Sequence, residues 1–183
     1  MEIKGQDGCY LYISPQEKEK SIEEYGECLK MLKENSVRQE EKYLAIAKGM
    51  KVLLIEDNIA CQKLAAAYLK TMGIKCLSMR NGEEAITYME KDSCDLILVD
   101  QILPDMEGTD IVKTLRKKSA LENSFPPVIM MISYERPDME KLLKESGILD
   151  YMIKPIDIKQ IKRVLLTYLK KEAAEAKGQA EEP

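Results

Sequence analysis

Acidic side chains stand at the ends of two apolar runs in this sequence. Asp100 follows Leu-Ile-Leu-Val at residues 96–99, and Glu56 and Asp57 follow Val-Leu-Leu-Ile at residues 52–55. If both runs are parallel strands of one sheet, the three carboxylates meet beyond the carboxyl ends of the strands, where open α/β sheets bind ligands. Crowded carboxylates disfavour one another's ionised forms, so the arrangement predicts a bound cation. An all-oxygen ligand set with room for water and phosphate favours Mg²⁺.

Two further side chains belong to the same predicted edge. The apolar run 129–132 ends at Ser133, and the run 151–153 ends at Lys154, which Pro155 follows. A carboxylate beside Mg²⁺ can attack a phosphoryl group and become an aspartyl phosphate. The transferred group needs charge stabilisation on its oxygens, which the Ser133 hydroxyl and the Lys154 ammonium could supply. The edge therefore has the residue types that phosphoryl transfer to a carboxylate requires.

Five strand–helix units are needed to position these residues, and residues 51–171 alternate accordingly between apolar runs and amphipathic stretches. We expect strands at 51–56, 74–78, 95–99, 128–132 and 150–153, and helices at 59–72, 82–91, 109–117, 138–146 and 157–171. The first, third and fourth strands are almost unbroken apolar runs, which is typical of strands buried on both faces. The second is less apolar and suits an edge. The pattern predicts an α/β fold, flavodoxin-like and doubly wound, with five parallel strands in the order 2-1-3-4-5.

The flanking segments differ from this domain. Residues 1–49 are predicted to form a mostly helical extension, with a short strand at 9–13 and a helix that begins at Ser14. The extension is either one long helix or a helical hairpin. It either pairs two chains as a homodimer, serves as a linker, or packs on its own domain. Residues 172–183 lack apolar anchors and are predicted to be a disordered tail.

Composition excludes several classes of protein. The net charge of −4 gives no broad nucleic-acid footprint, and no apolar run approaches the ~20 residues that span a membrane. The amino terminus lacks an apolar leader segment, so we expect a cytoplasmic protein without direct nucleic-acid or membrane binding. The five cysteines form no C-x-x-C pair, which fits reduced thiols. The absence of histidine excludes histidine-based triads, histidine metal sites and a phosphohistidine on this chain.

Together, these motifs resemble the receiver domain of two-component response regulators, of the chemotaxis-regulator kind. The resemblance covers residues 50–171 and rests on Leu53–Asn58, on Asp100 with Pro104–Gly108, on Ser133 and on Tyr151–Pro155. It implies that Asp100 is the phosphoacceptor. It also implies that Mg²⁺ is held by Glu56, Asp57, Asp100 and the backbone carbonyl of Ile102.

The resemblance assigns roles to the other residues of the edge as well. Ser133 and Lys154 would contact the phosphoryl oxygens, and the bond between Lys154 and Pro155 would be cis. Tyr151 would be the aromatic switch that turns inward when Ser133 moves toward the phosphate. Tyr134 departs from the small residue usual in the family, and its ring could narrow access to Asp100.

The function implied is a phosphorylation-controlled signalling switch, with no enzymatic activity beyond its own phosphorylation and dephosphorylation. A histidine kinase or a histidine phosphotransfer protein would phosphorylate Asp100, and a downstream protein target would bind the changed surface. Three alternatives stay open at this point: a phosphorylation-independent interaction module, the receiver fragment of a hybrid histidine kinase, and a Mg²⁺-dependent phosphatase or hydrolase. The loop after Asp100 offers no acid or base at residues 101–103, which disfavours the last of these.

Overall fold

The computed structural model describes residues 2–4, 10–12, 30, 31, 33–35, 37, 38, 40–118 and 125–178. The chain divides into two compact units, Met1–Lys42 and Tyr43–Pro183. In the first unit, β1 (Glu2–Lys4) pairs antiparallel with β2 (Tyr10–Tyr12), and every described residue from 30 to 42 is helical. The strand expected at 9–13 is therefore present as β2, whereas its partner β1 was not predicted. The helix start expected at Ser14 lies outside the described residues.

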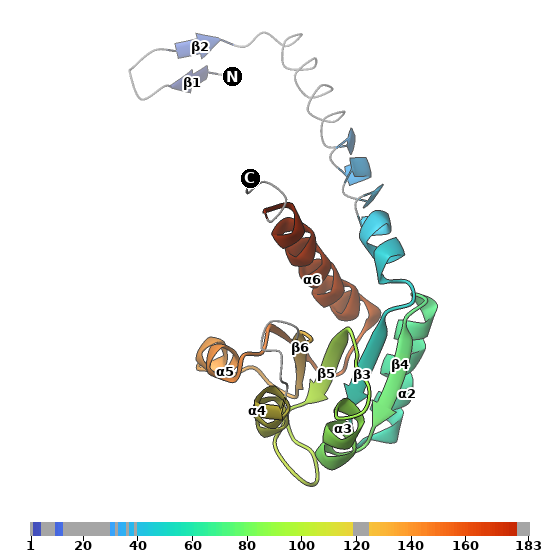
Figure 1. The fold of residues 1–183 in the computed structure, drawn as a ribbon. Helices are drawn as coiled ribbons and strands as arrows, with labels where there is room; N and C mark the ends of the chain where they lie inside the picture. Colours follow the sequence, from blue (N-terminus) through green and yellow to red (C-terminus); the bar gives the residue numbers. More distant parts are fainter. Residues whose placement is uncertain are drawn as a thin grey trace. The chain divides into compact units, whose positions relative to one another are not determined.

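The second unit is built on a five-stranded parallel sheet with helices on both faces (Figure 1). Its strands are β3 (Lys51–Ile55), β4 (Lys75–Met79), β5 (Leu96–Asp100), β6 (Val128–Ile132) and β7 (Asp150–Ile153). Its helices are α2 (Ile59–Thr71), α3 (Gly82–Met89), α4 (Gly108–Lys118), α5 (Met139–Ser146) and α6 (Ile158–Gly178). The strand order β4-β3-β5-β6-β7 confirms the predicted order 2-1-3-4-5 and the doubly wound fold.

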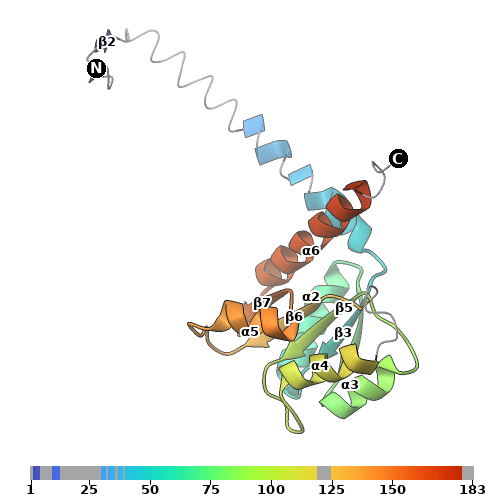
Figure 2. The same cartoon turned by 60° about the vertical axis from the view of Figure 1, so that its left-hand side comes forward.

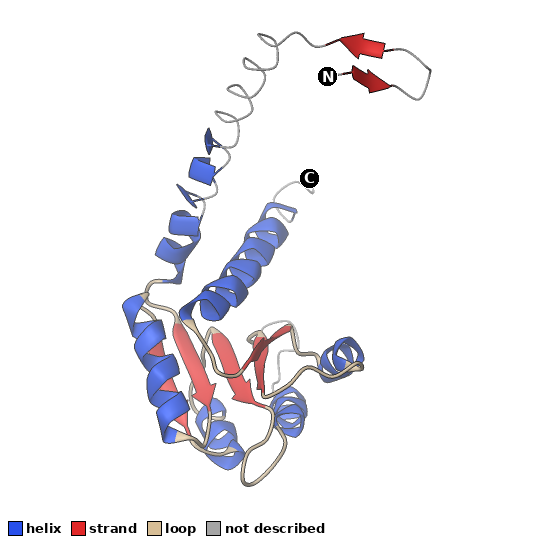
Figure 3. Cartoon of the chain, turned by 180° about the vertical axis from the view of Figure 1, so that it is seen from behind, coloured by secondary structure: helices blue, strands red, loops and turns tan. Residues whose placement is uncertain are grey.

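Two apolar cores lie on the two faces of this sheet, because successive side chains of a strand point to opposite sides. Leu54, Leu98 and Met131 belong to the core that contains buried residues of α2 and α6. Leu53 and Ile97 belong to the other core, which contains buried residues of α3, α4 and α5. Figures 2 and 3 show the sheet and the helices that flank it from two further directions. The central strands are buried on both faces, as their unbroken apolar sequences predict.

The amino-terminal boundary of the second unit differs from the one expected at residue 50. Tyr43 and Leu44 are partly buried against the core of the α2 and α6 face, and Ala47 is fully buried in it. The Gly49 amide then donates to the Gly73 carbonyl at 2.9 Å, which ties the incoming chain to the turn after α2. The end of the helical extension is thus part of the domain core.

Helix α6 continues to Gly178, beyond the end expected at residue 171. The tail predicted to be disordered from residue 172 is therefore helical as far as residue 178. The reason is that Ala, Glu and Lys dominate residues 171–177, and these strong helix formers extend a helix that packing has already nucleated. Within the described residues, no helix combines the length and the apolar character needed to cross a bilayer.

Candidate functional site

Three carboxylates meet at the carboxyl ends of β3 and β5. Glu56 and Asp57 directly follow β3, and Asp100 is the last residue of the neighbouring β5. One oxygen from each of the three carboxylates lies within 4.8 Å of the other two. The Glu56 side chain is buried and that of Asp100 nearly so, with residue exposures of 1% and 8%, whereas Asp57 is exposed. The structure therefore brings together the acidic residues that the sequence places at two strand ends.

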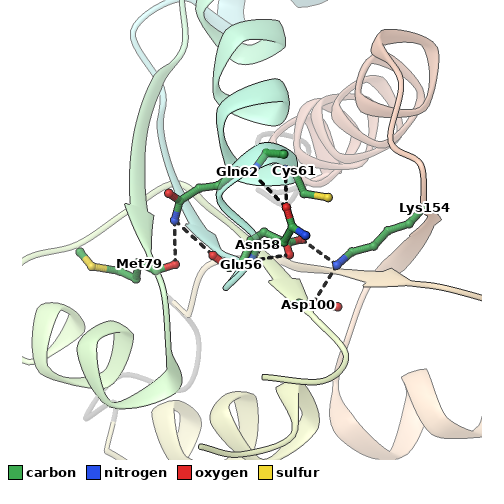
Figure 4. Close-up of polar contacts among 8 residues, drawn as sticks. Glu56, Asn58, Cys61, Gln62, Met79, Asp100 and Lys154 are labelled. Atoms are coloured by element: carbon green, nitrogen blue, oxygen red, sulfur yellow. Dashed lines mark hydrogen bonds and ion pairs between the residues drawn. The ribbon is translucent and has the colours of Figure 1, made fainter. Parts of the chain in front are cut away.

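Lys154 reaches the same cluster from the end of β7 (Figure 4). Its ammonium Nζ donates to Asp100 Oδ2 at 2.7 Å and lies 2.7 Å from Glu56 Oε2. The side chain of Lys154 is mostly buried, and the two carboxylates that it contacts are more buried still. One ammonium thus bridges two carboxylates that would otherwise repel each other in a poorly solvated place.

The electrostatics of the cluster follow from burial and from this bridge. Burial raises the pKa of Glu56, the nearby Lys154 ammonium partly offsets the rise, and the Asp100 carboxylate adds to it. For Lys154, burial acts to lower the pKa, but the combined hydrogen bonds and charges of Asp100 and Glu56 outweigh it and raise the pKa. Lys154 therefore stays protonated at neutral pH and serves as the shared counter-ion of Asp100 and Glu56.

The cluster has the composition of a Mg²⁺ site. The side-chain atoms available as metal ligands are all carboxylate oxygens, which are hard ligands suited to this ion. Among the described residues, the buried Glu56 Oε2 atom has no well-aligned hydrogen-bond donor, although the Lys154 ammonium lies within ion-pair distance. A buried carboxylate oxygen in this condition has coordinating capacity to spare. The residues present thus fit a small divalent cation.

The loop that carries Glu56 and Asp57 is held by two polar side chains that sequence reasoning missed. Asn58 caps α2, because its Oδ1 atom accepts from the amides of Ala60 and Cys61 at 2.9 and 3.1 Å. Gln62 donates through Nε2 to the carbonyls of Glu56 at 3.2 Å and Met79 at 3.1 Å (Figure 4). Asparagine before a helix is a common capping signal, whereas the Gln62 contact depends on the neighbouring strand β4.

The loop from β5 to α4 is a tight turn tied to α3. Ile102 forms a bridge with Glu107, and both carboxylate oxygens of Asp105 accept amides at the start of α3, from Gly82 at 3.0 Å and Glu83 at 2.9 Å. Gly108 closes the turn, since its amide donates to the Gln101 carbonyl at 2.9 Å. A methyl group at Gly108 would lie 2.3 Å from the Asp100 carbonyl oxygen, so only glycine fits there.

We expect Gly108→Ala to destabilise the domain by about 2–3 kcal/mol, because the clash is with backbone that cannot move aside. Gly82→Ala is the matched comparison, since its new methyl would meet the Met106 sulfur and the Ile111 side chain, which are partly adjustable. Urea unfolding measures both free energies. Equal stability of the Gly108 variant and the unmodified chain would contradict this account of the turn.

The predicted switch residues lie at the end of β6 and within β7. Ser133 follows β6 and is exposed, and Tyr151 lies in β7 with a half-buried ring. The Tyr151 hydroxyl donates to the Glu135 carboxylate, a contact that the sequence did not reveal because Glu135 looks like an ordinary loop residue. In the described residues, Ser133 has no hydrogen bond to the acidic cluster, so its phosphoryl contact stays a prediction.

Two further predicted features concern the rim of the site. The bond between Lys154 and Pro155 is cis in the structure, as predicted. Ile102 is 70% exposed and Tyr134 is 65% exposed. The predicted carbonyl ligand of Ile102 and the predicted effect of Tyr134 on access to Asp100 both stay predictions.

The hydrogen bond between Tyr151 and Glu135 gives a pH-dependent signature. The Glu135 carboxylate raises the pKa of Tyr151, most of all by accepting a hydrogen bond from the hydroxyl; burial and the charge of Glu135 raise it further. We expect Glu135→Gln to lower this pKa, because the phenolate no longer faces a carboxylate. NMR titration of ring-labelled tyrosine measures the change, and Tyr88, whose hydroxyl donates to Asp92, serves as the internal reference. A Tyr151 titration that does not move would show that the bond is not formed in solution.

Comparison with known proteins places this geometry in context. A family model described as the response regulator receiver domain matches residues 52–166. Sporulation initiation phosphotransferase F of Bacillus subtilis is 33% identical over 119 residues, which cover 65% of this chain and 93% of that protein. The sensor histidine kinase GacS of Pseudomonas protegens is 27% identical over 132 residues. That match covers 72% of this chain but only 14% of the kinase.

Solved structures agree with the sequence comparisons. The chemotaxis protein CheY4 of Vibrio cholerae aligns with a TM-score of 0.59 at 26% identity, covering 64% of this chain and 96% of that one. The receiver domain of the sensor histidine kinase PA1611 from Pseudomonas aeruginosa aligns with a TM-score of 0.59 at 27% identity, covering 67% and 98%. The structure of that domain has a magnesium ion coordinated in its active site cleft.

Proposed function

The chain belongs to the family of response regulator receiver domains, and from this premise we propose that Asp100 is the residue that takes up the phosphoryl group. The observation that carries the proposal is the bridge at Asp100 Oδ2, where the Lys154 ammonium lies 2.7 Å away. One carboxylate oxygen of Glu56 and one of Asp57 lie within 4.8 Å of an Asp100 oxygen. The Lys154 ammonium thus orients an Asp100 carboxylate that lies at the end of its strand, as activation of a carboxylate nucleophile requires.

In the proposed reaction, an Asp100 oxygen attacks the phosphorus of a phosphohistidine. A phosphorus–oxygen bond forms, the phosphorus–nitrogen bond breaks, and the released imidazole takes a proton from solvent. The Lys154 ammonium moves with its charge from a carboxylate oxygen to a phosphoryl oxygen, and the Ser133 hydroxyl donates to another. The acyl phosphate that results carries more negative charge at this edge than Asp100 did.

Mg²⁺ is the ion that we propose for the acidic cluster. Glu56, Asp57, Asp100 and the carbonyl of Ile102 would hold it, in keeping with the hard-oxygen composition of the site. When bound, it neutralises charge that builds up on the phosphoryl oxygens during transfer. The magnesium in the related receiver domain of PA1611 supports this proposal.

A protein is the proposed phosphoryl donor, either a histidine kinase or a histidine phosphotransfer protein. These 183 residues contain no histidine, so a donor histidine must lie outside them. Large apolar side chains are exposed just after three of the strand ends, namely Ile59 at the start of α2, Ile102 in the loop after β5 and Tyr134 in the loop after β6. Exposed apolar groups at the rim of a polar site are typical of protein contact surfaces.

The proposed output is a change of the surface near β7. The Tyr151 hydroxyl is held by Glu135, which lies two residues after Ser133. A movement of Ser133 toward a phosphoryl group would shift this loop, release Tyr151 and let its ring turn inward. A downstream protein that prefers one of the two arrangements would then respond to phosphorylation.

We propose two molecular contexts for this switch. The match to GacS supports a hybrid kinase as one context, and the match to nearly all of a sporulation phosphotransferase supports a stand-alone switch as another. We propose that residues 1–42 act as a dimerisation or linker segment. Light scattering of the full chain, with and without beryllofluoride, tests whether this segment pairs chains and whether Asp100 controls the pairing.

The proposal is tested by NMR titration of the full chain with beryllofluoride, a mimic of the phosphoryl group, in Mg²⁺. We expect shifts at Ser133, Tyr151 and Lys154 that disappear when EDTA removes the metal. Asp100→Asn should abolish these shifts, whereas the matched control Asp110→Asn should keep them, because Asp110 is an exposed carboxylate in the first turn of α4 that pairs with Lys113. An unchanged spectrum of the folded protein would favour the phosphorylation-independent interaction module instead.

A further inference from the structure

The Asp57 carboxylate differs from the Glu56 and Asp100 carboxylates in its contacts. Glu56 and Asp100 both contact Lys154, at 2.7 Å each. In the described part of the chain, the exposed Asp57 carboxylate has no hydrogen bond or ion pair that would orient it. Its direction therefore depends on the backbone from which it projects.

That backbone is fixed by the Gln62 side-chain amide. Gln62 Nε2 donates to the Glu56 carbonyl, which belongs to the peptide group joining Glu56 to Asp57. The same nitrogen donates to the Met79 carbonyl at the end of β4. Because both partners are carbonyls, the nitrogen must face them, and the orientation of this amide is unambiguous. The Met79 carbonyl also accepts the Glu56 amide at 3.1 Å, so Gln62 completes a closed junction between two strand ends.

The position of Gln62 makes this junction rigid. Gln62 lies one turn into α2, where its own amide donates to the Asn58 carbonyl at 2.9 Å, and it is half-buried. Asn58 caps the same turn, and its backbone N–H donates to Glu56 Oε1 at 3.2 Å. The loop 56–58 is thus held from the helix side and from the strand side at once (Figure 4).

The geometry points to Gln62 as a positioning residue that aims Asp57 at the cation of this site. The inference rests on the proposed function, because it takes Asp57 as a ligand of Mg²⁺. Gln62 itself lies one peptide group away from the ligand and does not touch the metal. Partners that orient a ligand in this way typically change metal affinity by 10–100-fold when they are removed.

Gln62→Met is the variant that isolates this role. Methionine has a similar length and helix propensity but cannot donate a hydrogen bond. We expect the dissociation constant for Mg²⁺, measured by NMR titration of the full chain, to rise roughly tenfold. In the absence of metal, the NMR signals of the backbone amides of Asp57 and Arg80 should shift. These amides share peptide groups with the two carbonyls that lose their hydrogen-bond donor.

Two controls separate positioning from general loss of stability. Val164→Ala shortens a buried apolar side chain of α6 that offers no ligand to a metal, and it should lower the melting temperature without changing Mg²⁺ affinity. In an Asp57→Asn background, Gln62→Met should have little further effect on Mg²⁺ affinity, because the residue that it positions no longer binds as a carboxylate.

The outcomes are distinct. An unchanged Mg²⁺ affinity in Gln62→Met would overturn the inference while leaving the proposed function intact, and so would an equal loss in Val164→Ala. Full additivity of the Gln62 and Asp57 effects would show that Gln62 acts elsewhere, which also overturns it. If the unmodified chain binds no Mg²⁺, the metal part of the proposed function fails first and the role of Gln62 falls with it.

Discussion

Replacement of Asp100 with asparagine is expected to reduce phosphorylation of the chain by roughly 100-fold or more, which is the scale of loss when a nucleophile is removed. Asparagine keeps the shape of the side chain but cannot form the acyl phosphate. The measurement is incorporation of phosphate from acetyl phosphate in the presence of Mg²⁺, followed by intact-mass analysis. The Lys154 contact that holds Asp100 Oδ2 at 2.7 Å should survive in part, so the variant should remain folded.

Asp110→Asn controls for the change of charge in this experiment. Asp110 is exposed at the start of α4 and pairs only with the neighbouring Lys113 among the described residues. We expect its phosphorylation to match that of the unmodified chain. Phosphorylation of Asp100→Asn at the unmodified rate would mean that another group accepts the phosphoryl group.

Replacement of Lys154 with methionine is expected to destabilise the metal-free domain by about 3 kcal/mol at neutral pH. The side chain keeps its apolar stem, but Glu56 and Asp100 lose their shared counter-ion in a place where Glu56 is almost fully buried. Removing one partner of a buried pair leaves an uncompensated charge, and losses of this size are usual. Urea unfolding in EDTA measures the difference.

The pH dependence of the Lys154→Met effect follows from Glu56. Burial raises the pKa of Glu56 in the folded protein above its ordinary value. Its stabilising contribution is therefore complete below the ordinary pKa and is lost as the pH rises through the raised one. Without Lys154, the pKa of Glu56 in the folded protein rises further, so the variant loses more stability at neutral pH than the unmodified chain does. The two stability curves should converge as the pH falls, and a gap that stays constant would contradict this origin of the effect.

Much of the fold was predictable because its strands are locally encoded. Residues 96–99 and 128–132 form almost unbroken apolar runs, and both became fully buried strands in the centre of the sheet. The acidic cluster was predictable for the same reason, since the ends of parallel strands meet at one edge. Placement of Glu56, Asp57 and Asp100 needed only the strand ends and the strand order.

Other features depend on contacts between distant segments and could not be predicted. In the sequence, Gln62 looks like an ordinary polar residue of a helix. Its partner Met79 lies 17 residues further on, at the end of β4. Tyr43 and Leu44 look like the end of an extension, but they pack against the domain core. Strand β1 has only three residues, too few to show a period of two, and it forms by pairing with β2.

The most direct test of the central claim is to locate the phosphoryl group. The full chain is treated with acetyl phosphate and Mg²⁺, reduced with borohydride to convert an aspartyl phosphate into homoserine, and analysed by peptide mass spectrometry. The account predicts homoserine at position 100, and its loss when EDTA is added. Modification at another acidic residue, or none in a folded sample, would contradict it.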